Sequence, residues 1–130
     1  MVTSPGPAIV WFRSDLRLQD NHALAAAVSL SVPVLPVFIL DDEGEGKWRA
    51  GGASRWWLHH SLTQFDLALR KIGSRLVIRR GDSLENLMDL LKMTRATAVF
   101  WNRCYEPRAI ARDARIKTEL SKIGRRSEEL

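Results

Sequence analysis

Cysteine, long apolar runs and an N-terminal targeting pattern are all scarce or absent in this chain. Cys104 is the one cysteine in 130 residues, so no internal disulfide can form and an oxidising compartment is not implied. The longest apolar runs, such as Val32–Leu40, are far too short to span a bilayer. Residues 1–7 lack the basic stretch and apolar region of a signal peptide. These absences predict a soluble, cytoplasmic protein with no membrane partner.

Sequence signatures of several common active sites are missing too. The loop predicted at Arg13–Asn21 contains no glycine, whereas a dinucleotide-binding loop needs glycine so that its backbone can approach a pyrophosphate. Neither a phosphate-cradling loop nor a nucleophile elbow is present. His59 and His60 are adjacent and point to different faces of a helix, and Cys104 has no partner at a ligand spacing. We therefore expect neither a metal site nor catalytic residues in this chain.

The composition is that of one globular domain, which we place at residues 1–130. The chain is 45% hydrophobic and 27% charged, and a chain of this length buries a core without disulfides or metals. Its net charge of +5 is uneven: −2 over residues 1–50, +4 over 51–100 and +3 over 101–130. A basic balance favours polyanionic partners, but no nucleic-acid-binding motif accompanies it. Solvated helix faces account for most of this charge.

Apolar runs alternate with helical stripes along the chain. Strands are expected at Ala8–Phe12, Val32–Leu40, Arg75–Arg80 and Ala96–Trp101. Four helices are expected between and after these strands. The first covers residues 22–30, and the second carries the apolar stripe Leu58, Leu62, Phe65, Leu69 and Ile72. The third carries the stripe Leu84, Leu87, Met88 and Leu91, and the fourth begins at Pro107, carries Ala109, Ile116, Leu120 and Ile123, and ends at Gly124. The alternation predicts an α/β fold, a doubly wound parallel sheet in the strand order 3-2-1-4 with helices on both faces.

The sequence after Gly124 departs from this pattern. An α/β chain of this kind normally enters a further apolar strand, whereas residues 125–130 are polar. The sequence therefore predicts that the usual fifth strand is missing and that the chain is truncated. The unpaired sheet edge would then be a contact surface for a homo-oligomer.

The carboxyl ends of the predicted strands mark the most promising surface for a ligand. In open α/β sheets, ligands bind outside these ends, near the point where the strand order reverses. Arg13 follows the first predicted strand, while Asn102 and Glu106 follow the fourth. These polar groups predict the rim of a crevice, although ion pairs that merely close the loops would use the same residue types.

Aromatic side chains flank this crevice. Strand tryptophans usually belong to the core, which is what we expect of Trp11 and Trp101; otherwise, with Tyr105, they offer faces to a flat ligand. Trp56 and Trp57 are neighbours on a predicted helix, so at least one ring lies off the core face. That ring is available to stack on a ligand or to dock another domain.

Two segments carry a resemblance to a known family. Residues 11–21, W-F-R-S-D-L-R-L-Q-D-N, closely resemble the opening W-F-R-x-D-L-R-x-x-D-N of the DNA photolyase/cryptochrome family. Residues 101–107, W-N-R-C-Y-E-P, are similar to its W-N-x-x-Y-E-P segment, and Arg112-Asp113 resembles the R-D of the following helix. The resemblance runs from about Ile9 to Gly124. It implies the N-terminal, Rossmann-like α/β domain that holds an antenna chromophore.

The resemblance also implies what this chain does not do alone. In that family a second, helical domain carries FAD and flips a damaged pyrimidine pair out of DNA for blue-light-driven repair. FAD, DNA contacts and deoxyribodipyrimidine photo-lyase activity are therefore expected of a helical partner domain outside these 130 residues. The isolated chain is expected to be inactive.

The antenna ligands follow from the resemblance only in part. Asp41, Arg55 and Glu106 match the positions that contact a deazaflavin, whereas Cys104 stands where that pattern has an aspartate. Family members that use methenyltetrahydrofolate have an Asn-Glu pair where this chain has Arg108 and Ala109. The resemblance thus implies a deazaflavin or flavin antenna rather than a folate. With the crevice residues added, the candidate site is Arg13, Asp41, Arg55, Asn102, Cys104 and Glu106.

Two other functions stay open at this point. One is a nucleotide-binding or cryptochrome-like signalling module, and the other is a purely structural or dimerising fragment. Chromophore absorbance that copurifies with the protein favours an antenna domain, and tight binding of an adenine nucleotide favours a signalling module. A concentration-dependent mass favours a dimerising fragment.

Overall fold

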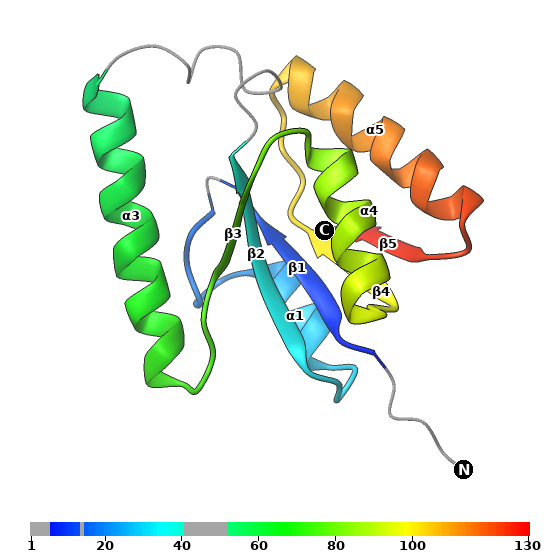
Figure 1. Cartoon of the computed structure of the whole chain (residues 1–130), viewed down its shortest axis with the longest axis horizontal. Helices are drawn as coiled ribbons and strands as arrows, with labels where there is room; N and C mark the ends of the chain where they lie inside the picture. The colour runs from blue at the N-terminus through cyan, green and yellow to red at the C-terminus, as the bar shows by residue number, and fades with distance from the viewer. Residues whose placement is uncertain (1–5, 14, 41–51) are drawn as a thin grey trace.

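The computed structural model describes residues 6–13, 15–40 and 52–130, with the backbone alone at 52–55 (Figure 1). Within these residues the elements are β1 Ala8–Phe12, α1 His22–Val28, β2 Val34–Leu40, α3 Gly52–Lys71, β3 Val77–Arg80, α4 Ser83–Thr94, β4 Ala98–Trp101, α5 Pro107–Lys122 and β5 Arg126–Glu129. The alternation expected from the apolar runs is therefore confirmed. No helix in the described part of the chain has the length and hydropathy that crossing a membrane requires.

The strands form one parallel sheet in the order β3-β2-β1-β4-β5. The predicted order 3-2-1-4 is confirmed, with β1 at the centre. Ala8 of β1 lies opposite Val34 of β2 on one side and opposite Ala98 of β4 on the other. All five residues of β1 are buried. A strand that is covered on both faces has no reason to alternate, which explains its continuous apolar sequence.

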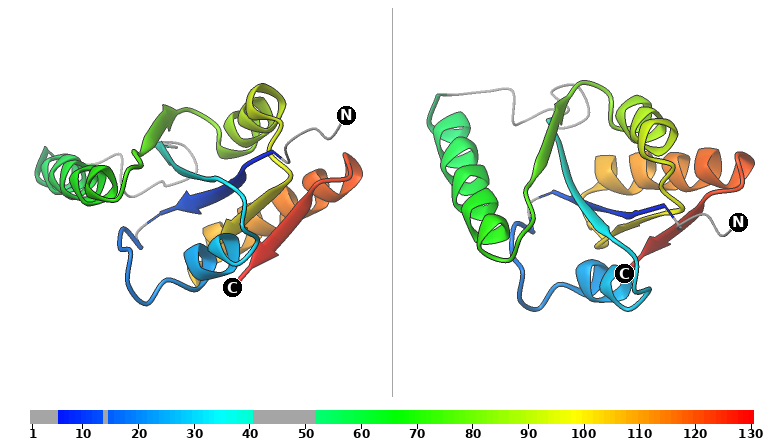
Figure 2. Two further views of the ribbon diagram at one scale, coloured as in Figure 1. Left: turned by 90° about the horizontal axis from the view of Figure 1, so that it is seen from below. Right: turned by 60° about the horizontal axis from the view of Figure 1, so that its bottom comes forward.

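Helices cover both faces of the sheet (Figure 2). Trp11 and Trp101 lie on one face, in a core with α4 and α5 residues Leu87, Leu90, Leu91, Ile116 and Leu120. Phe12 and Phe100 lie on the other, in a core with α1 and α3 residues Ala23, Ala27, Phe65 and Leu69. Because α1 follows β1 on one face and α5 follows β4 on the other, the loops after these neighbouring strands part at the carboxyl edge of the sheet.

Short side chains cap two of the helices. Asn21 is the N-cap of α1, and its Oδ1 accepts a hydrogen bond from the Leu24 backbone N–H at 3.0 Å. Asp82 is the N-cap of α4, and its Oδ2 accepts from the Glu85 N–H at 2.9 Å. Each of these side-chain oxygens accepts a hydrogen bond from a backbone N–H in the first helical turn, which has no carbonyl partner within the helix.

The apolar stripes of α3 and α5 end earlier than the sequence predicted. Ile72 and Ile123 follow the last helical residues, Lys71 and Lys122, and their exposed fractions are 67% and 49%. Beyond the end of a helix, the periodic spacing no longer fixes the direction of a side chain. Both isoleucines therefore lie outside the core to which the sequence assigned them.

The prediction of a missing fifth strand is wrong. β5 pairs in parallel with β4, with Arg126 opposite Ala98 and Glu129 opposite Trp101. β5 lies at the edge of the sheet, so it does not need an apolar sequence to be stable there. Its last residue instead receives a 2.9 Å hydrogen bond from Arg103 Nε to Glu129 Oε1. Since β5 covers β4, the sheet edge expected to drive oligomerisation is already occupied.

Candidate functional site

Asn102, the first residue after β4, joins the two loops at the carboxyl edge of the sheet. Its Nδ2 donates to Asn21 Oδ1 at 2.8 Å and to Asp15 Oδ2 at 2.5 Å. Its Oδ1 accepts from the Ala23 backbone N–H at 2.9 Å. One amide side chain thus fixes the loop after β1 and the first turn of α1 to the end of β4.

A buried ion pair links Arg13, the residue after β1, to Asp113 of α5. Nη1 of Arg13 lies 2.8 and 2.7 Å from the two carboxylate oxygens of Asp113, and its Nη2 donates to the backbone carbonyl of Asn102. The Arg13 and Asp113 side chains are only 10% and 2% exposed. Arg112 Nε lies 3.5 Å from the same carboxylate. We call this network the clasp; its members are Arg13, Asp15, Asn21, Asn102 and Asp113.

Two arginines lie over Trp11 beside the clasp. The guanidinium carbons of Arg13 and Arg112 are 4.7 and 5.1 Å from the Trp11 ring centroid, a cation–π arrangement. Trp101 meets the same ring edge-on, with centroids 5.6 Å apart. Both tryptophans are at most 1% exposed, so their assignment to the core is confirmed. Their indole N–H groups have no acceptor among the described residues.

The structure brings together some of the six predicted site residues. Arg13 and Asn102 meet in the clasp, so their polar groups are largely engaged within the protein. Cys104 is a half-buried free thiol in the loop after β4. Glu106 is exposed at the N-cap position of α5, and its side chain makes no capping hydrogen bond. Arg55 belongs to the first turn of α3, where only the backbone is described, and Asp41 lies outside the described residues.

Sequence reasoning missed Asp113 as a key residue. Asp113 follows Ala109 by four positions and precedes Ile116 by three, so it interrupts the buried stripe of α5. A carboxylate at such a position must find a cationic partner, because burial of an unpaired charge is costly. That signal was present in the sequence. The partner, Arg13, lies 100 positions away and only the fold identifies it.

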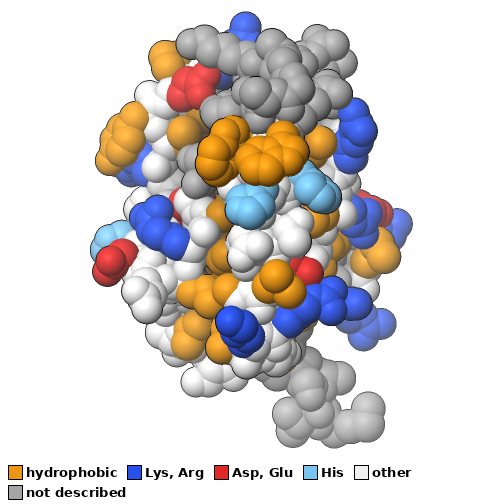
Figure 3. Space-filling view, turned by 90° about the vertical axis from the view of Figure 1, so that its left-hand side faces the viewer, with side chains coloured by type: hydrophobic (Ala, Val, Ile, Leu, Met, Phe, Trp, Pro, Cys, Tyr) orange, Lys and Arg blue, Asp and Glu red, His pale blue; other side chains and the backbone are white. Residues whose placement is uncertain are grey.

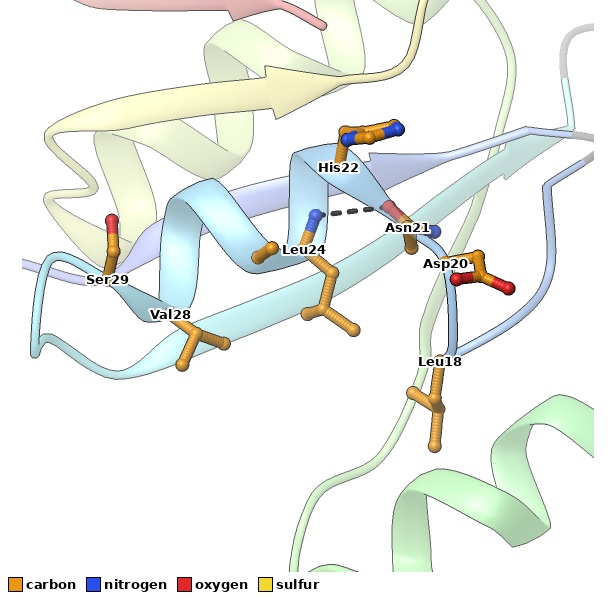
Figure 4. Close-up of a pocket in the computed structure, with 8 residues that line it drawn as sticks. Leu18, Asp20, Asn21, His22, Leu24, Val28 and Ser29 are labelled. Carbon is orange, nitrogen blue, oxygen red and sulfur yellow. Dashed lines mark hydrogen bonds between the residues drawn. The ribbon is translucent and has the colours of Figure 1, made fainter.

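A shallow, open hollow of about 600 Å³ lies alongside α1 (Figure 4). Leu18, Leu24 and Val28 contribute its apolar surface, and Asp20 and His22 contribute polar groups. The hollow is bordered by the loop after β1 and by α1, and no residue of the loop after β4 lines it. It is therefore a weaker candidate for a ligand site than the carboxyl edge of the sheet.

Two carboxylates away from the clasp have lowered pKa values. Hydrogen bonds from the Leu76 backbone N–H and from Arg70 lower the pKa of Asp66. Burial raises the pKa of Glu129, but Arg103 and Lys117 outweigh this effect and the net pKa is lowered. Both carboxylates have structural partners. The described residues contain no group of three or more histidine, cysteine, aspartate or glutamate side chains arranged to hold a metal ion.

Comparison with known proteins decides the family. The family model described as DNA photolyase matches residues 8–130, nearly the whole chain. The chain belongs to the DNA photolyase family. It is 46% identical to Cryptochrome-1 of Arabidopsis thaliana over 93% of its own length and 18% of that protein. It is also 46% identical to a deoxyribodipyrimidine photo-lyase of Agrobacterium fabrum, over 95% of this chain and 25% of the photolyase.

Solved photolyase structures share the fold. A class III photolyase from Agrobacterium tumefaciens superposes with a TM-score of 0.87 at 44% identity, over 99% of this chain and 27% of that one. An archaeal photolyase from Sulfolobus tokodaii superposes with a TM-score of 0.84 at 31% identity, over 95% of this chain and 28% of that one. The chain thus spans about a quarter of these photolyases and corresponds to their N-terminal, Rossmann-like α/β domain. The expectation drawn from the W-F-R and W-N motifs is confirmed.

Proposed function

We propose that this photolyase-family domain binds a flavin or deazaflavin antenna chromophore at the carboxyl ends of β1 and β4. The observation that carries the proposal is the clasp, which holds the loops after these two strands in a fixed frame where the strand order reverses. The Sulfolobus tokodaii photolyase, described as holding two FAD molecules with the implication of a novel light-harvesting cofactor, supports it. Rigid loops suit an antenna because its orientation governs how well excitation is transferred.

The loop from Asn102 to Glu106 offers groups that fit a flavin-type ring. Such a ring is flat, with carbonyl acceptors and an imide N–H donor along one edge. Tyr105 is 79% exposed, so its ring is free to stack. The Glu106 carboxylate is exposed and not used as a helix cap, which leaves it available to accept from a ring N–H. Asp41 and Arg55 complete the set that the family resemblance implies.

Each group has a limited task in this proposal. Arg13 and Asn102 act mainly through the clasp, where they position the loops. Tyr105 and Glu106 orient the chromophore, and the half-buried Cys104 contributes to the floor of the site. When bound, the chromophore supplies light absorption and passes the excitation on. FAD, DNA recognition and repair or signalling are functions that we propose for the remainder of a longer, cytoplasmic photolyase-like protein.

A titration with matched variants tests the proposal. The purified chain is titrated with a deazaflavin, with FAD and with methenyltetrahydrofolate, and bound chromophore is followed by absorbance and fluorescence. Glu106→Ala is expected to weaken deazaflavin binding about tenfold or more, which is the loss typical of one charged hydrogen bond. Glu85→Ala removes an exposed carboxylate on α4 and serves as the control.

The outcomes of this titration separate clearly. Unchanged circular dichroism shows that neither substitution affects the fold. Preferential binding of the folate overturns the choice of chromophore, although it keeps the site. Equal affinities of the wild type and Glu106→Ala, or no binding by either protein, overturn the proposal.

A further inference from the structure

The outward face of α3 lacks charge. Between residues 56 and 69 the sequence WWLHHSLTQFDLAL has one Asp and no Glu, Lys or Arg. That Asp66 is already engaged, since its carboxylate accepts 2.8 Å hydrogen bonds from both the Leu76 N–H and Arg70 Nε. Surface helices normally carry charged residues on the face opposite the core. Depletion of charge is instead the signature of a surface that becomes covered.

Exposed aromatic rings occupy the N-terminal part of this face. Trp56 and Trp57 are 59% and 62% exposed. The Trp56 ring stacks on His60, with centroids 5.4 Å apart and planes within 5°, and it meets Trp57 edge-on at 5.3 Å. Figure 3 shows this side of the molecule, where a broad hydrophobic area lies directly above two histidine side chains. Exposed tryptophans are costly in water and are among the strongest contributors to protein interfaces.

The C-terminal part of the same face carries different groups. Leu67 is 49% exposed, and Lys71 is exposed with no ion-pair partner among the described residues. At 100° per residue, the exposed positions Trp56, His60, Thr63, Leu67 and Lys71 fall within about a quarter of the helix circumference. The buried Phe65 and Leu69 lie on the opposite side. One stripe therefore runs from aromatic, through neutral polar, to aliphatic and basic.

We propose that α3 pairs in an antiparallel manner with α3 of a second copy of this chain. The stripe is complementary to itself when it is reversed. With Thr63 and Gln64 beside the two-fold axis, Lys71 of one copy lies opposite Trp56 of the other, and Leu67 lies opposite His60. A cation over an indole and an aliphatic side chain against an aromatic ring are both favourable contacts. The pairing is isologous and closes on itself.

The low charge of this face permits the approach of a second copy. Two chains of net charge +5 repel each other over most of their surface. Between Trp56 and Leu67 the outward stripe of α3 carries no charged side chain, and in the antiparallel register the single Lys71 of each copy faces Trp56 rather than another cation. Antiparallel helices also set their dipoles in opposite directions. The sheet edge at β4 offers no such contact, since β5 already covers it.

The size of the contact sets its strength. A helix of 20 residues is about 30 Å long and 10–12 Å wide, so the shared face covers roughly 300 Å² per copy. Stable interfaces bury about 800 Å² per partner. The dimer is therefore weak and transient.

Sedimentation equilibrium of the 130-residue chain between about 10 µM and 1 mM tests the pairing. The wild type is expected to shift from monomer to dimer across this range. Trp56→Lys is expected to weaken association at least tenfold, because it places a cation opposite Lys71 of the other copy. Ile110→Lys on α5 is the matched control, because Ile110 is 52% exposed and lies outside the stripe. Since both side chains are exposed, circular dichroism should show the wild-type fold for both variants.

A cysteine placed near the proposed axis tests the register. In a Cys104→Ser background, Gln64→Cys is expected to form an interchain disulfide under mild oxidation, whereas Thr118→Cys on the exposed side of α5 is not. A monomeric mass at every concentration up to 1 mM overturns the proposal. That result is expected if the outward face of α3 binds a different protein. Equal effects of Trp56→Lys and Ile110→Lys, or equal cross-linking at 64 and 118, overturn it as well.

Discussion

Arg13 and Asp113 lie 100 positions apart in the sequence, yet one guanidinium nitrogen of the arginine contacts both carboxylate oxygens of the aspartate, at 2.8 and 2.7 Å. The pair joins the end of the central strand to the middle of α5. Because the Asp113 side chain is 2% exposed, its charge has almost no access to water. Removal of either partner would therefore leave a buried charge without compensation, which is strongly destabilising.

Asp113→Asn is expected to destabilise the fold by about 3 kcal/mol, because it leaves the Arg13 charge buried without its partner. Urea unfolding followed by circular dichroism measures the change. The control is Asp89→Asn, which breaks the Arg79–Asp89 pair on the surface, where Asp89 is 52% exposed. That substitution should cost less than about 1 kcal/mol. Similar losses for both variants would mean that the clasp adds little to stability.

Asn102→Ala removes the side-chain hydrogen bonds to Asp15, Asn21 and the Ala23 N–H. We expect a loss of about 2–3 kcal/mol, since several buried polar groups lose their partner together. Hydrogen exchange gives a local measurement: the Ala23 amide should exchange faster. The Glu85 amide, which is held by Asp82 at the start of α4, should change only as much as global stability does. Uniform acceleration at both amides contradicts a local role.

Asp66 makes the stability of the fold depend on pH in the acidic range. Its folded-state pKa is lowered, first by the Leu76 N–H and then by Arg70, so the ionised form binds its partners best. The resulting stabilisation is complete above the unfolded-state pKa of about 4 and is lost as the pH falls through the lower folded-state value. The stability difference between the wild type and Asp66→Asn should therefore shrink between about pH 5 and pH 2. A difference that stays constant in urea melts over this range contradicts the assignment.

Position 104 offers a gain-of-function test of the antenna proposal. The deazaflavin-binding pattern of the family has an aspartate where this chain has Cys104. Cys104→Asp is expected to tighten deazaflavin binding about tenfold, by adding one charged hydrogen bond. Cys104→Ser controls for removal of the thiol, and thermal melts monitor the cost of a new carboxylate at a half-buried position. Affinity no better than that of Cys104→Ser argues against a deazaflavin at this site.

Whether an element could be predicted from the sequence depends on how far apart in the chain its stabilising contacts lie. The elements from β1 to α5 could be predicted because their signals are local: a continuous apolar run at Ala8–Phe12, an Asp82 cap, and stripes such as Leu87 and Leu91. β5 could not, because an edge strand is held by its neighbour's backbone and by Arg103, neither of which marks its own sequence.

The candidate site shows the same division. Asn102 and Glu106 could be placed at the carboxyl edge of the sheet because the strand order follows from general rules of α/β topology. The use of Arg13 and Asn102 within the clasp depends on contacts between distant segments, which sequence spacing does not reveal.

The placement of the tryptophans makes this protein its own spectroscopic reporter. Trp11 and Trp101 are sealed in a core with no acceptor for their indole N–H groups among the described residues, so they should emit at short wavelength and resist iodide. Trp56 and Trp57 are open to water, so they should emit at longer wavelength and be quenched readily. In a Trp48→Phe background, which removes the fifth tryptophan outside the described residues, iodide should therefore shift the emission of the folded chain to the blue. Any event that covers α3 should reduce that shift while leaving the core emission unchanged.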